Sequence, residues 1–406
     1  MIADGYKDTE IGVIPIEWEI VSLGDVLEYE QPTKYLVETT DYDNSYSIPV
    51  LTAGKSFILG YTNETSGIYE NLPAIIFDDF TTASKYVDFP FKAKSSAMKI
   101  LKVRNKEYPT NLFYEYLNSV EFEAGTHKRY WISEYQNLKI PLPPLKEQEK
   151  IADILSTADD KIEAIATQIK KTEILKKGLL QKLLSEGVGH SEYKDSELGK
   201  IPKSWKVVLL PSIALDEKNS IKVGPFGSQI KKEDLVASGY KLYGQENVVE
   251  NNFYIGDRYL CEKKYKALKS SQIISGDIVI TMMGTGGQSK VVPLDIEEGI
   301  MDSHLMRIRV NNKKIKNYFL SRLINEAFFI RKQIEKFSQG GIMSGLSKGI
   351  ISVIKIPLPP IEEQKQIAEI LSTADEKLEV LRAKKEKYET LKKGLLQKLL
   401  SGEVRV

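Results

Sequence analysis

The chain has 406 residues with 57 basic and 56 acidic side chains, so its formal net charge at pH 7 is +1. This length suits about two to four domains rather than one hydrophobic core. No apolar run approaches the ~20 residues of a membrane-spanning helix, and the polar start MIADGYKDTEIG does not resemble a signal peptide. Cys261 is the only cysteine, which excludes an internal disulfide and a cysteine-built zinc site. These features predict a cytoplasmic protein.

The near-neutral average hides an uneven distribution of charge. Residues 1–139 hold 13 basic against 21 acidic side chains, whereas residues 188–355 hold 26 against 18. The acidic part still contains a basic stretch at 81–106, in which Asp88 is the only acid. A basic segment is typical of nucleic-acid binding, although charged runs are more often solvated faces.

Two long repeats divide the chain. The head YKDTEIGVIPIEWEIVSL at 6–23 returns as YKDSELGKIPKSWKVVLL at 193–210, and the tail IPLPPLKEQEKIADILSTADDKIE at 140–163 returns as IPLPPIEEQKQIAEILSTADEKLE at 356–379. Head, variable body and constant tail therefore occur twice, which indicates a tandem duplication. The predicted segments are a first body at 1–139, a first helical tail at 140–187, a second body at 188–355 and a second helical tail at 356–406.

The tails are predicted to form long helices that pair with each other. Pro143 and Pro144 mark the entry to the first helix, and apolar residues from Leu155 to Ile169 recur in steps of three and four. This is the seam of a coiled coil, which one helix cannot bury alone, so the two copies are expected to pack as an antiparallel pair. A break at Thr157, as part of a capping box with Asp160, is the alternative to one continuous helix.

Both tails end in the same LKKGLLQKLLS, at 175–185 and at 391–401. Its apolar face is wider than a two-helix seam requires. The surplus predicts a docking site for partner subunits, and packing against the protein's own bodies is the alternative. The leucines predicted to dock a partner are Leu179, Leu180, Leu183, Leu395, Leu396 and Leu399.

Each body is predicted to contain strands first and a helix late, which gives an α+β fold class with two α/β bodies separated by the helical pair. The bodies contain no recognisable catalytic motif. TAGKS at 52–56 lacks the first glycine of a P-loop, and MMGTGGQSK at 282–290 lacks the glycine spacing of a dinucleotide fingerprint. Asp78 and Asp79 have no partner carboxylate and lysine at nuclease spacing, and the three histidines lack metal-ligand spacing. We therefore predict no catalytic residue and no metal site.

Several polar and basic segments of the bodies suit contact with DNA. Lysine suits phosphate or guanine, glutamine can bind adenine bidentately, and glycine-rich turns bring backbone N–H groups close to phosphate. The residues predicted to bind DNA in the first body are Thr81, Thr82, Ser84, Lys85, Lys92 and Lys94. Those predicted in the second body are Ser228, Gln229, Lys231, Lys232, Gln245, Asn247, Thr285, Gln288, Ser289 and Lys290. An ordinary polar turn is the alternative for each segment.

Taken together, these parts resemble the specificity (S) subunit of type I restriction–modification enzymes. The order of two diverged bodies and two near-identical tails carries the resemblance, together with GPFGSQIKKEDLVASGYKLYGQEN, SGDIVITMMGTGGQSKVVP and AIIFDDFTTASKYVDFPFKAKSSAMKIL. The resemblance implies that each body is a target-recognition domain that reads one half of a split, asymmetric site in double-stranded DNA.

The resemblance also implies partners and cofactors. The helices would act as a spacer and as a platform for two modification subunits, which bind S-adenosylmethionine. Restriction subunits, which use ATP and Mg²⁺, would join this complex. This chain would hold no cofactor itself and would not be an enzyme. Two alternatives remain at this point: the specificity subunit of another multi-subunit restriction–modification enzyme, and a coiled-coil scaffold with two protein-binding domains.

Overall fold

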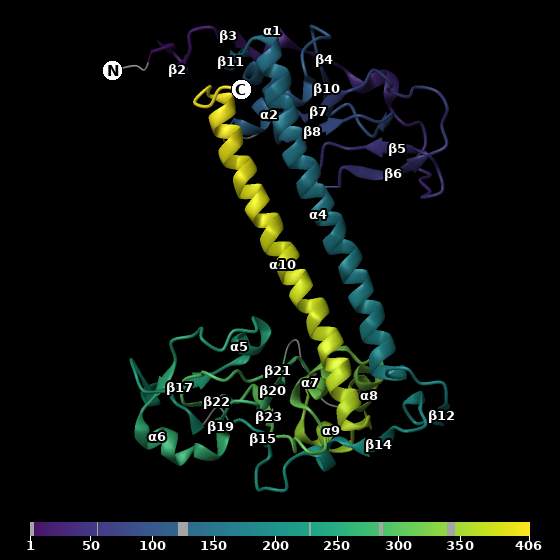
Figure 1. Cartoon of the computed structure of the whole chain (residues 1–406), viewed down its shortest axis with the longest axis vertical. Coiled ribbons are helices and arrows are strands. Elements are labelled where there is room, and N and C mark those ends of the chain that lie inside the picture. The colour runs from purple at the N-terminus through teal and green to yellow at the C-terminus, as the bar shows by residue number, and fades with distance from the viewer. Residues whose placement is uncertain (1–3, 55, 121–128, 227–228, 284–286, 339–345) are drawn as a thin grey trace. The chain divides into compact units, whose positions relative to one another are not determined.

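The computed structural model of the chain describes residues 4–54, 56–120, 129–226, 229–283, 287–338 and 346–406 (Figure 1). The chain divides into two compact units. The first unit comprises Met1–Gln168 with Leu381–Val406, and the second comprises Ile169–Val380. No helix among the described residues has the length and the apolar character needed to span a membrane.

The first unit contains a small head and two sheets. The head pairs β1 with β2, and β3 pairs with β11, the strand that leads into the first long helix. A four-stranded antiparallel sheet has the order β4-β10-β7-β8, and a three-stranded sheet has the order β6-β5-β9. The elements are β1 (Tyr6–Thr9), β2 (Gly12–Pro15), β3 (Glu19–Ser22), α1 (Leu23–Val26), β4 (Leu27–Glu30), β5 (Ile48–Leu51), β6 (Ile58–Thr62), β7 (Ala74–Asp78), β8 (Ser84–Val87), β9 (Lys92–Ala93), β10 (Met98–Val103), α2 (Thr110–Ser119), α3 (Tyr130–Ser133) and β11 (Lys139–Leu142).

The second unit repeats this plan with a larger second sheet. Its four-stranded antiparallel sheet has the order β15-β23-β20-β21, and its five-stranded sheet has the order β16-β18-β17-β22-β19. The elements are β12 (Tyr193–Ser196), β13 (Gly199–Pro202), β14 (Lys206–Leu209), β15 (Ile221–Val223), β16 (Leu235–Val236), β17 (Tyr240–Tyr243), α5 (Gln245–Val249), β18 (Tyr259–Leu260), α6 (Glu262–Ala267), β19 (Gln272–Ile273), β20 (Ile278–Thr281), β21 (Ser289–Val291), β22 (Gly299–Met301), β23 (Leu305–Ile308), α7 (Asn317–Glu326), α8 (Phe328–Ser338), α9 (Lys348–Val353) and β24 (Lys355–Leu358).

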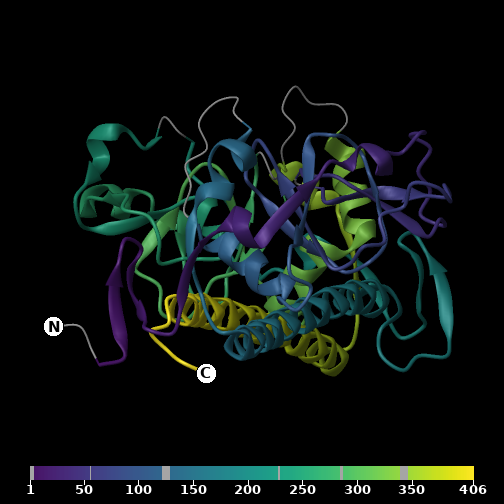
Figure 2. The ribbon, with the colours of Figure 1, turned by 90° about the horizontal axis from the view of Figure 1, so that it is seen from above.

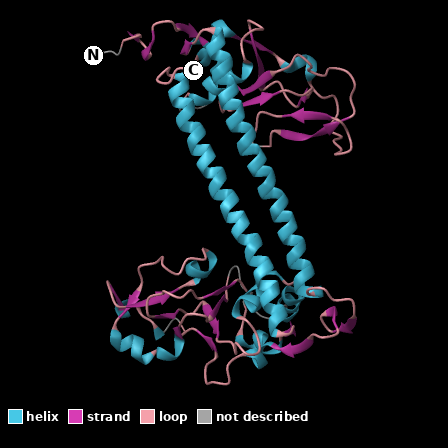
Figure 3. Cartoon of the chain, viewed as in Figure 1, coloured by secondary structure: helices cyan, strands magenta, loops and turns pink. Residues whose placement is uncertain are grey.

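The duplication inferred from the sequence is also a duplication of strand register. Val21 lies opposite Ile140 in the first unit, and the corresponding residues Val208 and Ile356 lie opposite each other in the second. Both bodies mix strands and helices (Figure 3). The predicted α+β fold class is therefore confirmed.

The two tails form α4 (Leu145–Glu186) and α10 (Ile361–Leu400), each a single continuous helix. The Thr157 hydroxyl donates to the Asp153 carbonyl one turn earlier (2.8 Å), so it does not break the helix as a cap would. Each helix is divided between the two units. In the first unit, Ile151 and Leu155 of α4 share a buried cluster with Leu399 of α10.

The second unit contains the complementary halves of both helices. There Leu180 and Leu184 of α4 share a cluster with Ile367 and Leu371 of α10. In each unit the start of one helix meets the end of the other, so the predicted antiparallel pairing is confirmed.

A glutamate in the first turn of each long helix ties the head to the end of the other helix. In the first unit, Trp18 Nε1 donates to Glu147 Oε2 (2.9 Å) and Arg405 Nε donates to Glu147 Oε1 (2.6 Å). The residues after α10 therefore lie beside the head (Figure 2), where Tyr6 also donates to the Gly402 carbonyl. Burial alone would raise the pKa of Glu147, but the hydrogen bonds from Arg405 and Trp18 outweigh it and hold the pKa below its usual 4.5.

The second unit builds the same contact with one different partner. Trp205 Nε1 donates to Glu363 Oε2 (2.9 Å), and His190 Nε2 lies 2.6 Å from Glu363 Oε1 in the place that a guanidinium takes in the first unit. Each head is therefore anchored to a long helix through a nearly buried carboxylate.

A second polar contact joins each body to the helical pair, and it uses equivalent positions in the two units. In the first unit, Lys392 of α10 lies between Glu115 of α2 (2.6 Å) and Asp159 of α4 (2.7 Å). Burial raises the pKa of the Glu115 carboxyl, although Lys392 opposes this shift. We call this aspartate–lysine pair of the long helices the cradle.

The second unit has the same cradle with a body residue of opposite charge. Asp375 of α10 pairs there with both Lys176 of α4 and Arg322 of α7. Asp375 repeats Asp159 and Lys176 matches Lys392, whereas Arg322 stands where the first body has Glu115. The constant helices therefore offer one acid and one base, and each body uses the one of opposite sign.

We expect the charge of the body residue at the cradle to be exchangeable. Lys392→Met should lower the free energy of unfolding by about 2–4 kcal/mol, because it leaves the buried Glu115 facing Asp159 without a cation. Adding Glu115→Arg should restore most of this loss, because the new guanidinium can pair with Asp159. Urea unfolding of the two single variants and the double variant measures the coupling. If the double variant lost as much free energy of unfolding as the two single variants together, the cradle would accept only one sign of charge on the body residue.

We expect Arg405→Gln to lower the stability of the first unit at pH 7 and to make that stability less sensitive to acid. Because the folded-state pKa of Glu147 is lowered, its contribution to stability is complete above about pH 4.5 and is lost as pH falls through the lowered pKa. Without the guanidinium, burial raises the pKa of Glu147. Protonation of Glu147 then stabilises the folded state, so the difference in stability between the two proteins should shrink as pH falls. The urea midpoint of both proteins between about pH 7 and pH 4 tests this, and parallel curves over that range would contradict it.

Candidate nucleic-acid interface

The hairpin of β7 and β8 presents the predicted DNA-binding residues of the first body. Asp78 Oδ1 accepts the backbone N–H groups of Phe80 (2.9 Å) and Thr81 (3.3 Å), so the tip of the hairpin is held in a defined turn. Thr82 has φ of 61°, a left-handed conformation that this turn requires. Thr81 and Lys85 are exposed and Thr82 is half-buried. These three remain predicted DNA contacts.

Asp79 fixes the base of the same tip from inside the protein. It is 2% exposed, its Oδ1 accepts the Trp131 N–H (2.9 Å), and its Oδ2 lies 3.5 Å from the buried Lys99 ammonium. Its role is therefore structural. The described residues contain no group of three potential metal ligands around it or elsewhere.

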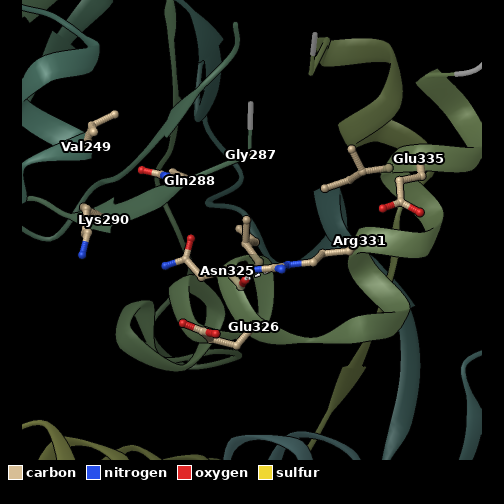
Figure 4. Close-up of a pocket in the computed structure, with 10 residues that line it drawn as sticks. Val249, Gly287, Gln288, Lys290, Asn325, Glu326, Arg331 and Glu335 are labelled. Carbon is tan, nitrogen blue, oxygen red and sulfur yellow. Dashed lines mark hydrogen bonds between the residues drawn. The ribbon is translucent and has the colours of Figure 1, made fainter. Parts of the chain in front are cut away.

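The second body carries an equivalent hairpin, β20 with β21, beside a cavity of about 550 Å³ (Figure 4). Gln288 is exposed and Lys290 is half-buried, and both line the cavity together with Asn325 of α7 and Arg331 of α8. Arg331 Nε donates to the Asn325 carbonyl (3.0 Å), which joins the two helices at the cavity wall. Thr285, also predicted to bind DNA, lies outside the described residues.

A serine and an asparagine lock each hairpin to the helix that follows it. Ser84 Oγ donates to Asn118 Oδ1 of α2 (2.8 Å) in the first body. In the second body, the Ser289 N–H donates to Asn325 Oδ1 (2.7 Å) and Asn325 Nδ2 donates to the Ser289 carbonyl (2.9 Å). The sequence analysis missed both asparagines, although Ser-Lys followed by a helical Leu-Asn or Ile-Asn in both bodies was a usable signal.

Four residues predicted to bind DNA are buried and make their contacts within their own body. Ser84 and Ser289 are buried and hydrogen-bonded to the asparagines just described. Lys92 is 1% exposed, pairs with Glu64 (2.5 Å) and donates to the Ser66 carbonyl. The Asn247 side chain is buried, and its amide nitrogen donates to two backbone carbonyls while its oxygen accepts the Gly244 N–H, so no N–H donor is left for a base.

The segment after Val223 brings further predicted residues to the surface. Gly224 packs so closely on the Asp302 carbonyl that a Cβ would lie 1.7 Å from its oxygen, so only glycine fits there. Next to it, Phe226 is 78% exposed, a large apolar side chain that the sequence analysis did not select. Gln229, Lys231 and Lys232 are exposed, and the two lysines line a cavity of about 310 Å³. Ser228 lies outside the described residues.

Two further predicted residues already have a contact within their own body. Lys94 is half-buried with its ammonium 5.7 Å from the centre of the Tyr42 ring. Gln245 is half-buried, and its side-chain oxygen accepts the Met283 N–H (3.2 Å), which ties the start of α5 to the residues that follow β20. For both residues, contact with DNA remains a prediction.

Leucines predicted to dock partner subunits lie in the protein's own cores instead. Leu180 and Leu183 belong to the core of the second unit and Leu399 to that of the first, with 8%, 6% and 0% exposure. Leu179, Leu395 and Leu396 are partly buried against the same clusters. The wide apolar face exists because each helix end packs both on its partner helix and on a body. For the buried leucines, this is the alternative to partner docking that the sequence left open.

The exposed leucines of the repeated segment are at a different position. Leu175 and the corresponding Leu391 are 61% and 55% exposed, although both belong to LKKGLLQKLLS. In each copy of the segment, the first leucine is therefore exposed, whereas the other leucines are buried or partly buried.

Comparison with known proteins places the chain in a family. The family model described as "Type I restriction modification DNA specificity domain" matches residues 15–174 and 227–390, once in each half. The specificity subunit of the type I restriction enzymes EcoR124I/EcoR124II from Escherichia coli is 36% identical over 91% of this chain and 89% of that protein. The MjaVIII specificity subunit from Methanocaldococcus jannaschii is 31% identical over 99% of this chain and 96% of that protein.

Solved structures agree on the fold. An S subunit structure of a type I restriction–modification system from M. genitalium superposes with a TM-score of 0.62 at 18% identity, covering 94% of this chain and 96% of that one. The chain carries the DNA specificity domain twice, which defines its class as a DNA-specificity protein. The chain belongs to the family of type I restriction–modification specificity subunits. This supports the specificity subunit over the coiled-coil scaffold weighed from the sequence.

Proposed function

We propose that each body reads one half of a bipartite, asymmetric site in double-stranded DNA, and that the helical pair sets the spacing between the two halves. The observation that carries this is that two hairpins in the same register expose different residues at their described tips, Phe80 and Thr81 in the first body and Met283 and Gln288 in the second. Equivalent scaffolds with different exposed side chains suit the reading of two different sequences.

The same proposal assigns catalysis to other subunits. Two modification subunits would bind S-adenosylmethionine and methylate the DNA, and restriction subunits would use ATP and Mg²⁺. A solved structure that superposes on this chain with a TM-score of 0.53 comes from a study of complex assembly and conformational transition of the type I R-M system. The purified chain alone is expected to transfer no methyl group to DNA.

Leu175 and Leu391 are the proposed contact points for the two modification subunits. They occupy equivalent positions in the two helices and are exposed, and a pair of equivalent sites suits two copies of one partner. Two lysines follow each of these leucines in the sequence, and Ile174 beside Leu175 is also exposed.

We expect the double variant Leu175→Glu with Leu391→Glu to fold normally and to lose the modification subunits on co-purification, because a partner would have to bury an unpaired carboxylate. The matched control is Leu180→Glu with Leu396→Glu, which places charges in the cores and should lower the thermal midpoint instead. If the Leu175 and Leu391 variant still co-purified with both subunits, the docking surface would lie elsewhere.

We expect the length of the helices to determine the spacer between the half-sites. Inserting seven residues after Ile165 and seven after Leu381 keeps the apolar seam in register and adds ~10 Å to the pair. At ~3.4 Å per base pair, the preferred spacer should grow by about three base pairs while both half-sites stay unchanged. Methylation of a DNA library with variable spacers measures this. A folded variant that still selects the original spacer would show that the helices do not set the distance.

A further inference from the structure

The two bodies share one Ser-Lys pair at the hairpins that are proposed to read different sequences. Ser84-Lys85 begins β8 and Ser289-Lys290 begins β21, and the register around them is the same. Ser84 lies opposite Phe77 and Lys85 opposite Ile76, while Ser289 lies opposite Ile280 and Lys290 opposite Val279. The serine in each case faces the interior and the lysine faces the opposite side of an edge strand.

The backbone on which each lysine stands is fixed by the serine–asparagine contact. Asn325 bonds to both the N–H and the carbonyl of Ser289, so it holds the start of β21 at two points. Asn118 holds Ser84 through one hydrogen bond between side chains. A lysine on a fixed strand end loses less conformational freedom on binding than one on a loose loop.

Among the described residues, neither Lys85 nor Lys290 forms an ion pair, and Lys290 lines the cavity beside its hairpin. Burial lowers the pKa of Lys290, the nearby cations Arg322 and Lys176 lower it further, and Glu326, which lines the same cavity, opposes this shift. An ammonium group that has no ion-pair partner at a hairpin or a cavity is available to an anionic ligand.

We propose that Lys85 and Lys290 each contact a backbone phosphate at the equivalent place in the two half-sites, and that Asn118 and Asn325 position them. This rests on the proposed function. Two bodies with different target sequences can share only an element that contacts what the targets have in common, which is the sugar-phosphate backbone. A lysine ammonium is a compact charge that suits a phosphate oxygen. On each hairpin, the shared lysine that adds affinity thus lies next to the tip residues that provide specificity.

The test uses the chain in complex with its modification subunits. Lys85→Gln and Lys290→Gln should each weaken binding about threefold to tenfold near 0.15 M salt, for specific and non-specific DNA alike. Each should reduce the slope of log K against log salt by ~0.9, and the double variant by about twice that. The set of methylated sequences, read by sequencing a methylated library, should stay the same. Lys200→Gln, at an exposed lysine of β13, is the control and should change neither quantity.

Asn325→Ala tests the positioning role separately. It should reduce the salt slope as Lys290→Gln does, whereas a purely structural role would lower the thermal midpoint and leave the slope unchanged. The proposal is overturned if the lysine variants keep the full slope, or if either one changes the base methylated or preferred at a single position. If the wild-type complex shows no sequence preference but its salt slope still depends on both lysines, the phosphate contacts stand and the proposed reading of half-sites fails.

Discussion

The antiparallel contact between the two long helices is the constraint on which the remaining structure depends. Neither α4 nor α10 can bury its apolar stripe alone, and each helix starts in one unit and ends in the other. A unit is therefore complete only when distant parts of the chain meet, as when Leu399 joins Ile151 in the first core. The carboxylates Glu147 and Glu363 then fix each head to this helical base, so the orientation of a body within its unit follows from the helices.

The cradle shows how one constant base can hold two diverged bodies. Its aspartate and lysine are the same in both units, and the body residue is an acid in one and an arginine in the other. An acid–base pair satisfies either sign, because the partner of opposite charge is always within reach. The bodies are thus free to diverge at their surfaces while their attachment is kept, which is the property that a family of sequence-specific DNA readers requires.

Within each body, the interior decides which polar residues are available to a ligand. Types of residue alone suggested that Ser84, Ser289, Lys92 and Asn247 contact DNA, because serine, lysine and asparagine are common in such interfaces. Each instead bonds to a group of its own body, which is a neutral side chain, a backbone carbonyl or a carboxylate. Lys85, Gln288 and Lys231 carry the same kinds of groups but remain accessible. The distinction depends on which face of a strand or turn a residue occupies, and a shift of one residue reverses it.

The sequence by itself determined the duplication, the two long antiparallel helices, the mixed bodies and the family, because repeats and heptad spacing are properties of residue order. It could not decide the fate of the leucines in LKKGLLQKLLS. Leu180 and Leu399 are buried while Leu175 and Leu391 are exposed, although all four lie in the same repeated segment. Nor could it pair Asn325 with Ser289, or Lys392 with Glu115, across long stretches of chain. Those choices belong to the tertiary structure, because burial and hydrogen bonding depend on which distant segments pack together rather than on local pattern.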